Sequence, residues 1–303
     1  MHVHVLTASP CLHVMAAVAC PLCPSSGASG TEPMAVASAD AVVAALQAAR
    51  DAGATSVALR GGELLARPEA LDLLRQARAL GFAAIELWSS GVALARPGVA
   101  EQVVAAGASH LAVALYGDTA AGHDYVAQVD GHFARAVAGL RRARAAGART
   151  AVVAPILRPS FRNLARIVQK SIPIDVGAVH LVAPTGRDRA AHPLLVPLPM
   201  AAPYLRAAVE VARAGRRRLT VRGVPACLLA DHGGEALATT PEFAADGSQS
   251  PAFGHGPPCQ TCTWRGPCRG QLVSLAEQHG WLGLAARSDL PPTPRAPENN
   301  IVV

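Results

Sequence analysis

The strongest constraint on the fold is an alternation of two kinds of segment that continues to about residue 215. Short apolar runs rich in β-branched residues alternate with stretches rich in alanine, leucine and arginine, several of which end at glycine. The apolar runs cover residues 3–6, 56–59, 83–88, 110–115, 150–156 and 176–182. The helical stretches cover residues 39–52, 68–81, 97–106, 133–146, 161–170 and 201–214. This order predicts six strand–helix units and a parallel sheet.

The apolar runs are nearly continuous, which is typical of strands that are buried on both faces of a parallel sheet. A closed TIM barrel has eight such units, so six units are too few to close one. The pattern alone therefore allows either a partial barrel or a doubly wound α/β sheet.

Composition excludes a disordered chain, because 51% of the residues are hydrophobic and only 16% are charged. The net charge of +6 permits an anionic partner without requiring one. No apolar run reaches the ~18–20 residues that a membrane helix needs. The apolar stretch 14–20 has no preceding lysine or arginine, and Pro10 and Cys11 interrupt the segment before it. We therefore expect no secretion signal and a cytoplasmic protein without membrane contact.

The seven cysteines fall into two groups, and in a cytoplasmic protein they indicate metal or redox chemistry rather than disulfides. The first group is Cys11, Cys20 and Cys23, and the second is Cys227, Cys259, Cys262 and Cys268. Four thiolates can saturate a zinc ion or a [4Fe–4S] cluster, whereas three leave one iron of a cluster open. The first group follows the first predicted strand, where barrel enzymes place their active sites.

Several short motifs resemble those of the radical SAM superfamily. Cys20-Pro21-Leu22-Cys23 resembles the end of its C-x3-C-x2-C motif, and Gly61-Gly62-Glu63 resembles its GGE motif. Weaker likenesses follow the third, fourth and sixth predicted strands, at Ser89-Ser90-Gly91, at 114–117 with His123-Asp124, and at 184–186. Every one of these motifs lies at the end of a predicted strand, and together they span roughly residues 3–215.

The resemblance implies an α/β fold with a partial (βα)6 TIM-like barrel and a small irregular C-terminal metal-binding region. It implies that Cys11, Cys20 and Cys23 hold a [4Fe–4S] cluster that binds S-adenosylmethionine. The expected cofactor-binding residues are Gly61, Gly62, Glu63, Ser90, Gly117 and Gly186. Reductive cleavage of S-adenosylmethionine would give a 5′-deoxyadenosyl radical that abstracts a substrate hydrogen. The reducing electrons would come from a donor such as a flavodoxin or a ferredoxin.

Two features depart from the family pattern. Eight residues separate Cys11 from Cys20 where the motif has three, and Leu22 stands where members usually carry an aromatic residue. A longer loop can still bring three thiolates to one cluster, because the entropy of loop closure grows slowly with loop length.

The C-terminal cysteines resemble part of the SPASM or twitch domains that carry auxiliary clusters in many radical SAM enzymes. Four cysteines allow one auxiliary [4Fe–4S] cluster, and structural zinc remains an alternative. We expect the barrel in 1–222, the cysteine-rich region in 223–285 and a disordered tail in 286–303. Peptide modification is the favoured reaction class by analogy. The rival function is that of a zinc-stabilised, non-catalytic binding protein on a decayed barrel.

The other polar residues near the motifs have ordinary structural interpretations. Asp118 and Asp124 are expected as turn or capping residues. His123 is expected as a solvated or core histidine. The arginines within 141–149 and 213–222 are expected on a solvated face.

Overall fold

The structure, a computed structural model, describes residues 2–6, 37–60, 62–184, 194–237, 242–244 and 253–292. Within these ranges one parallel sheet has the strand order β7-β6-β5-β4-β3-β2-β1-β8. Its strands are β1 (His2–Leu6), β2 (Ser56–Arg60), β3 (Ala84–Ser89), β4 (His110–Ala114), β5 (Arg149–Pro155), β6 (Ala178–Val182), β7 (Arg218–Arg222) and β8 (Glu242–Ala244). The two end strands, β7 and β8, are not hydrogen-bonded to each other, so the barrel is open.

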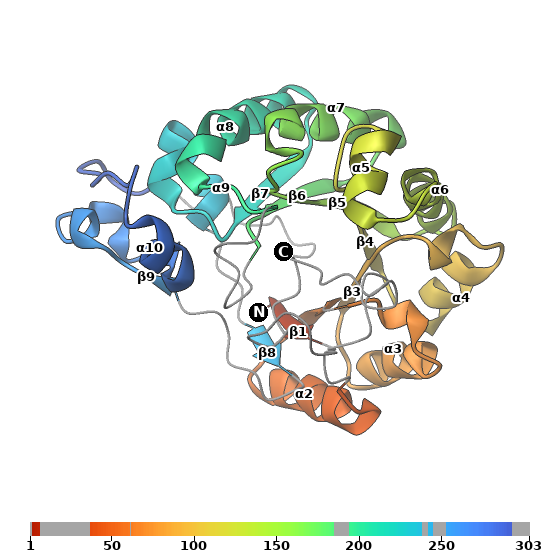
Figure 1. Cartoon of the computed structure of the whole chain (residues 1–303). Helices are drawn as coiled ribbons and strands as arrows, with labels where there is room; N and C mark the ends of the chain where they lie inside the picture. Colours follow the sequence, from red (N-terminus) through yellow and green to blue (C-terminus); the bar gives the residue numbers. More distant parts are fainter. Residues whose placement is uncertain are drawn as a thin grey trace.

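The helices lie around the outside of the curved sheet (Figure 1). They are α2 (Ala39–Asp51), α3 (Ala70–Ala79), α4 (Val99–Ala106), α5 (Ala120–Ala127), α6 (His132–Ala145), α7 (Leu164–Ile174) and α8 (Leu198–Ala214). The predicted partial (βα)6 barrel is confirmed. The described sheet also contains β7 and, beyond β1, the short β8.

Successive side chains of a strand point to opposite faces of the sheet. One row of side chains therefore faces the helices, and the other faces the barrel interior. The outer row belongs to the main core, in which Leu59 and Leu87 pack with helix residues such as Leu74 and Leu140. The inner row forms a separate small cluster, in which Ala112 and Val153 pack with other residues of the strands. The sheet therefore has a filled interior as well as a helix-covered outer face.

Besides β7, two described elements of the barrel differ from the sequence expectation. Helix α5 was not predicted, and it begins where the Thr119 hydroxyl accepts the Gly122 amide at 3.2 Å. Strand β8 lies in the stretch expected to be irregular, and it pairs with β1 from His4↔Glu242 to Leu6↔Ala244. This pairing joins residues far apart in sequence, so local patterns carry no sign of it.

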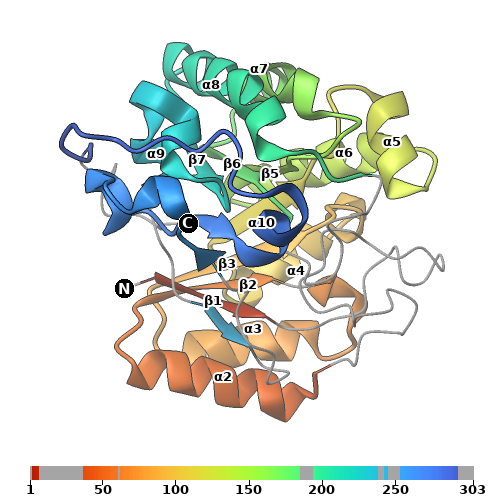
Figure 2. The same cartoon turned by 60° about the vertical axis from the view of Figure 1, so that its left-hand side comes forward.

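The C-terminal region is small and has its own short elements, which lie beside α9 (Gly234–Leu237) (Figure 2). They are a 3₁₀ helix (Ala226–His232), β9 (Phe253–Gly254), β10 (Gln271–Leu272) and α10 (Val273–His279). Trp264 is 2% exposed and packs against Ala226 in a separate apolar cluster. None of the described helices has both the length and the apolar character needed to cross a bilayer.

Candidate functional site

The described site residues expected from the motifs gather at the carboxyl ends of β2, β3 and β4. Gly62 and Glu63 follow β2 directly, Ser90 follows β3, and Gly117 lies just beyond β4. These strands are neighbours in the sheet, so their carboxyl ends meet at one edge, where barrel enzymes build their sites. Five of the expected site residues lie outside the described ranges: Cys11, Cys20, Cys23, Gly61 and Gly186.

The Glu63 carboxylate joins the loop after β2 to the loop after β3. It accepts the Ser90 amide at 2.7 Å and the Ser90 hydroxyl at 2.6 Å. The Ser89 hydroxyl lies 3.0 Å from both carboxylate oxygens, and the Leu65 amide donates at 3.2 Å. Sequence reasoning placed Glu63 and Ser90 at one site, and the structure adds that they contact each other.

Burial controls the chemistry of this carboxyl group. Glu63 is 4% exposed, and burial raises its pKa above the ordinary value of 4.5. The hydrogen bonds from Ser90, Ser89 and Leu65 oppose this rise without cancelling it. The group is thus held inside the protein, where it fixes the conformation of two adjacent loops.

Helix α6 packs against the turn that follows β3. Gly91 has φ +80°, and a Cβ at this position would lie 2.7 Å from Val113 Cγ1. A Cβ on Gly139 of α6 would lie 2.2 Å from the Gly91 carbonyl oxygen. This close backbone approach requires glycine at both positions, so α6 fixes the turn that carries Ser89 and Ser90.

Gly117 is required by the packing of α5 against the end of β4. A Cβ there would lie 2.8 Å from the His123 amide nitrogen. His123 is fully buried, and its Nδ1 accepts the Tyr116 amide at 3.1 Å. Its Nε2 therefore carries the proton and donates to His132 Nδ1 at 2.7 Å. The core interpretation of His123 is confirmed.

The capping role expected for Asp124 is also confirmed. Its carboxylate accepts the Gly131 amide at 2.8 Å and the Phe133 amide at 2.7 Å, at the start of α6. Burial alone would raise the pKa of Asp124, but these hydrogen bonds and the two nearby histidines lower it below 3.8.

A polar group inside the barrel was missed by sequence reasoning. The Arg60 guanidinium lies 5.4 Å from the centre of the Trp88 ring, and the ring of His180 is stacked parallel to Trp88 at 6.2 Å. Beside them Glu86 is 1% exposed. Burial raises the pKa of Glu86 to about 7, against the lowering effects of the neighbouring Trp88 side chain and of Arg222 and Arg60. The sequence did contain a signal for this group. Glu86 and Trp88 stand at alternate positions of an otherwise apolar strand, so both are on one face of it.

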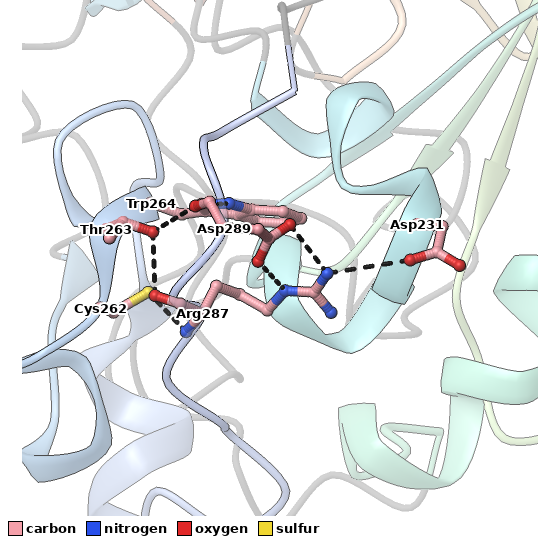
Figure 3. A network of polar contacts seen from close by, with 6 residues as sticks. All are labelled: Asp231, Cys262, Thr263, Trp264, Arg287 and Asp289. Atoms are coloured by element: carbon pink, nitrogen blue, oxygen red, sulfur yellow. Dashed lines mark hydrogen bonds and ion pairs between the residues drawn. The ribbon is translucent and has the colours of Figure 1, made fainter.

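The four C-terminal cysteines are free of disulfides. Among the described residues, no three His, Cys, Asp or Glu side chains are grouped as the ligands of one metal ion. Two of the four sulfurs nevertheless accept a backbone amide. Gly270 donates to Cys268 and Arg287 donates to Cys262 (Figure 3), both at 3.4 Å.

The thiols are near enough to influence one another's ionisation. Burial raises the pKa of Cys227 above 9.0, and the neighbouring thiols Cys268, Cys259 and Cys262 raise it further. The pKa of Cys259 is raised by the same causes. Four thiols that repel one another as anions need a cation to become thiolates together.

No protein-family model and no curated protein sequence matches this chain. Solved structures do match. SuiB from Streptococcus suis bound to its precursor peptide SuiA aligns with a TM-score of 0.55 and 12% identity, over 73% of this chain and 48% of that chain. The protein anSMEcpe with bound AdoMet aligns with a TM-score of 0.54 and 12% identity, over 73% of this chain and 63% of that chain. The latter protein has also been solved with AdoMet and the Kp18Cys peptide.

The FeFe-hydrogenase maturase HydG from Carboxydothermus hydrogenoformans aligns with a TM-score of 0.53 and 13% identity, over 80% of this chain and 58% of that chain. These three proteins are radical SAM enzymes, and at this identity the likeness shows that the chain has their fold. The chain spans between about half and under two thirds of their lengths.

Proposed function

We propose that this chain is a radical SAM enzyme that cleaves S-adenosylmethionine reductively and abstracts a hydrogen atom from its substrate. The proposal rests on the hydrogen bonds that Glu63 accepts from Ser89 and Ser90 at the carboxyl ends of β2 and β3. These residues lie in a barrel with the radical SAM fold. Cys11, Cys20 and Cys23 follow β1 in the sequence, and β1 pairs with β2.

The residues at this edge suit the expected cofactors in their chemistry. Gly62 has φ +74°, and without a Cβ its backbone can approach the methionyl amino group closely. Glu63 holds this turn in place through the loop after β3, and the three cysteines of the first group would ligate the cluster. When bound, the cluster and S-adenosylmethionine would supply the 5′-deoxyadenosyl radical.

The proposal extends to a second [4Fe–4S] cluster on Cys227, Cys259, Cys262 and Cys268, with zinc as the alternative metal. Two observations support a thiolate site: the four thiols are free of disulfides, and the sulfurs of Cys262 and Cys268 each accept a backbone amide. Amide hydrogen bonds to ligand sulfurs are a usual feature of iron–sulfur sites, where they tune the potential.

A peptide is the proposed substrate, and a flavodoxin or ferredoxin is the proposed electron donor. The support for a peptide is that two proteins of the same fold have been solved with peptides bound. This support is an analogy of fold, so the substrate assignment needs its own test.

Anaerobic reconstitution with iron and sulfide, followed by reduction with S-adenosylmethionine present, tests the activity without knowledge of the substrate. We expect about eight irons per chain, from two cubanes, and formation of 5′-deoxyadenosine. The Cys20→Ala/Cys23→Ala variant should form none. The matched Cys259→Ala/Cys262→Ala variant should hold about four irons and become protease-sensitive in its C-terminal third.

Different results would contradict the assignment of the first cysteine group and that of the C-terminal cysteines. Production of 5′-deoxyadenosine by Cys20→Ala/Cys23→Ala would show that the first site is wrongly assigned. A colourless wild-type protein that holds only zinc and forms no 5′-deoxyadenosine would identify the zinc-stabilised binding protein instead. About four irons with one zinc would assign the zinc to the C-terminal site.

A further inference from the structure

A row of four side chains crosses the barrel interior from β2 to β7. The Arg60 guanidinium lies 5.4 Å from the centre of the Trp88 ring, and the Trp88 ring stacks parallel to the His180 ring at 6.2 Å. His180 Nδ1 lies 3.0 Å from the Thr220 hydroxyl. Trp88 belongs to β3 and His180 to β6, and β4 and β5 lie between these strands in the sheet. The row therefore spans the interior, and we call its four side chains the floor.

Small residues on β4 and β5 leave room for the floor. The inward-facing cluster on these strands consists of Ala112, Ala151 and Val153, and the Trp88 side chain packs against it. Larger side chains at these three positions would compete with the Trp88 and His180 rings for the same space.

The floor lies next to the candidate site. Ala114 pairs with Val153, and Val153 pairs with His180. Because Ser89 pairs with the residue before Ala114, His180 lies in register with the turn that follows Ser89. A group bound on the floor is therefore beside the loops after β2 and β3, where the cofactor is expected.

Solvent reaches the floor from the carboxyl ends of the strands. Arg60, Trp88 and Thr220 are partly exposed, although their strand neighbours Leu59 and Leu87 are fully buried on the outer face. This difference shows that the inner row is accessible at the level of the floor, whereas the outer row is covered by helices.

The charge around the floor is positive. Arg222 is partly exposed and lies on the same face of β7 as Thr220, two residues nearer the carboxyl end. Among the inward-facing residues of β2 to β7, all of which the structure describes, Glu86 has the sole carboxyl group. Burial raises the pKa of Glu86, whereas Trp88, Arg222 and Arg60 lower it, so both guanidinium groups are near this carboxyl group. One buried carboxyl group cannot neutralise two guanidinium groups, so this part of the interior favours an added anion.

We propose that the floor is a substrate subsite, in which Arg60 and Arg222 bind the carboxylate of an aspartate or glutamate side chain of the substrate peptide. The inference rests on the proposed peptide substrate. A guanidinium group suits this role because it binds a carboxylate through two parallel hydrogen bonds. The Trp88 ring holds the Arg60 guanidinium in place, so less side-chain entropy is lost when the carboxylate binds.

The test uses two blocked tripeptides as probes, acetyl-Ala-Glu-Ala-amide and acetyl-Ala-Gln-Ala-amide. They differ only in whether the central side chain ends in a carboxylate or an amide. Binding to the full chain is followed by tryptophan fluorescence and by saturation-transfer NMR. Arg60→Gln and Arg222→Gln each remove one guanidinium group, whereas Arg60→Lys and Arg222→Lys keep the charge. Arg75→Gln is the matched control, because Arg75 is exposed on α3 and pairs with Asp72.

We expect the wild type to bind the Glu tripeptide about tenfold more tightly than the Gln tripeptide. Arg60→Gln and Arg222→Gln should lose most of this preference, the lysine variants should keep part of it, and Arg75→Gln should keep all of it. Urea unfolding checks that each variant is folded.

Three results would overturn the proposal. They are equal binding of the two tripeptides by the wild type, an unchanged preference in folded Arg60→Gln and Arg222→Gln, and displacement of the Glu tripeptide by S-adenosylmethionine. The last result would assign the two arginines to the carboxylate of the cofactor. Formation of 5′-deoxyadenosine by a wild type without the preference would still uphold the proposed function, and a preference without 5′-deoxyadenosine would uphold the subsite alone.

Discussion

Replacing Glu86 by glutamine tests whether a carboxyl group inside the barrel carries a proton near neutral pH. Glu86 lies on β3 and is 1% exposed. Burial raises its pKa from 4.5 to about 7, while the neighbouring Trp88 side chain and the guanidinium groups of Arg222 and Arg60 act in the opposite direction. The desolvation of the carboxylate therefore outweighs its favourable contacts.

The direction of the pH dependence follows from this shift. Because the folded-state pKa exceeds the unfolded value, the stability that the proton gives is fully present below pH 4.5 and is lost as the pH rises through about 7. One pKa unit corresponds to ~1.4 kcal/mol, so the whole shift corresponds to about 3 kcal/mol. Between pH 5 and pH 8.5 the wild type should lose about 2–3 kcal/mol that Glu86→Gln does not lose. The glutamine amide has nearly the shape of the carboxyl group and does not titrate.

Urea unfolding at pH 5, 6.5 and 8.5 measures this difference. The free energy of unfolding of Glu86→Gln should exceed that of the wild type increasingly as the pH rises. The exposed Glu277→Gln is the control, and its profile should run parallel to that of the wild type. A Glu86→Gln protein that is less stable than the wild type at pH 8.5 would refute the reasoning. It would show that Glu86 is ionised and that its pairing with Arg60 and Arg222 outweighs desolvation.

Three further substitutions test the contacts that hold the site. Gly139→Ala should cost about 1–3 kcal/mol in urea unfolding, because its Cβ would lie 2.2 Å from the Gly91 carbonyl oxygen, whereas Gly177→Ala, with 3.6 Å to its nearest atom, should cost less. Glu63→Gln should cost about 1–3 kcal/mol and weaken S-adenosylmethionine binding in calorimetry, and unchanged affinity would leave Glu63 a purely structural role. Asp124→Ala should cost about 1 kcal/mol at pH 7 by loss of its cap. Since the folded-state pKa of Asp124 is lowered, this contribution should shrink as the pH falls from 7 to below 3.8, and a cost that does not decrease over that range would contradict the assignment.

The parts of the fold that local signals encode were predictable from the sequence. Apolar runs located the strands, and the glycines at 53, 81, 107, 147 and 215 marked the ends of helices, because a helix commonly ends where glycine can leave the helical conformation. Strand β8 and the contacts of residues 287 and 289 with the turn after Cys262 were not predictable in this way. Each is held by partners distant in sequence, and residues 286–290, assigned to the tail, contact the turn after Cys262.

The candidate site likewise has features that the sequence predicts and features that it does not. The motifs placed Glu63 and Ser90 at neighbouring strand ends, since strand order alone determines which loops meet. The contact between them, the burial of Glu86 and the Arg60–Trp88–His180 stack depend on side-chain directions that become known only when the strands are placed in register. Sequence spacing also suggested that four cysteines share a site, but it gave no sign that the Arg287 amide donates to the Cys262 sulfur.

The edge of the site is held rigid by a series of contacts that begins on α6, a helix that carries none of the motifs. Gly139 of α6 allows the Gly91 backbone to approach, and this approach fixes the turn that carries Ser89 and Ser90. Their hydroxyls and the Ser90 amide hold Glu63 and therefore the turn at Gly62. Backbone groups positioned in this way lose little entropy when a ligand binds, which is the benefit of preorganisation. A methyl group on α6 should therefore disturb cofactor binding as well as stability, although α6 contributes no residue to the expected cofactor contacts.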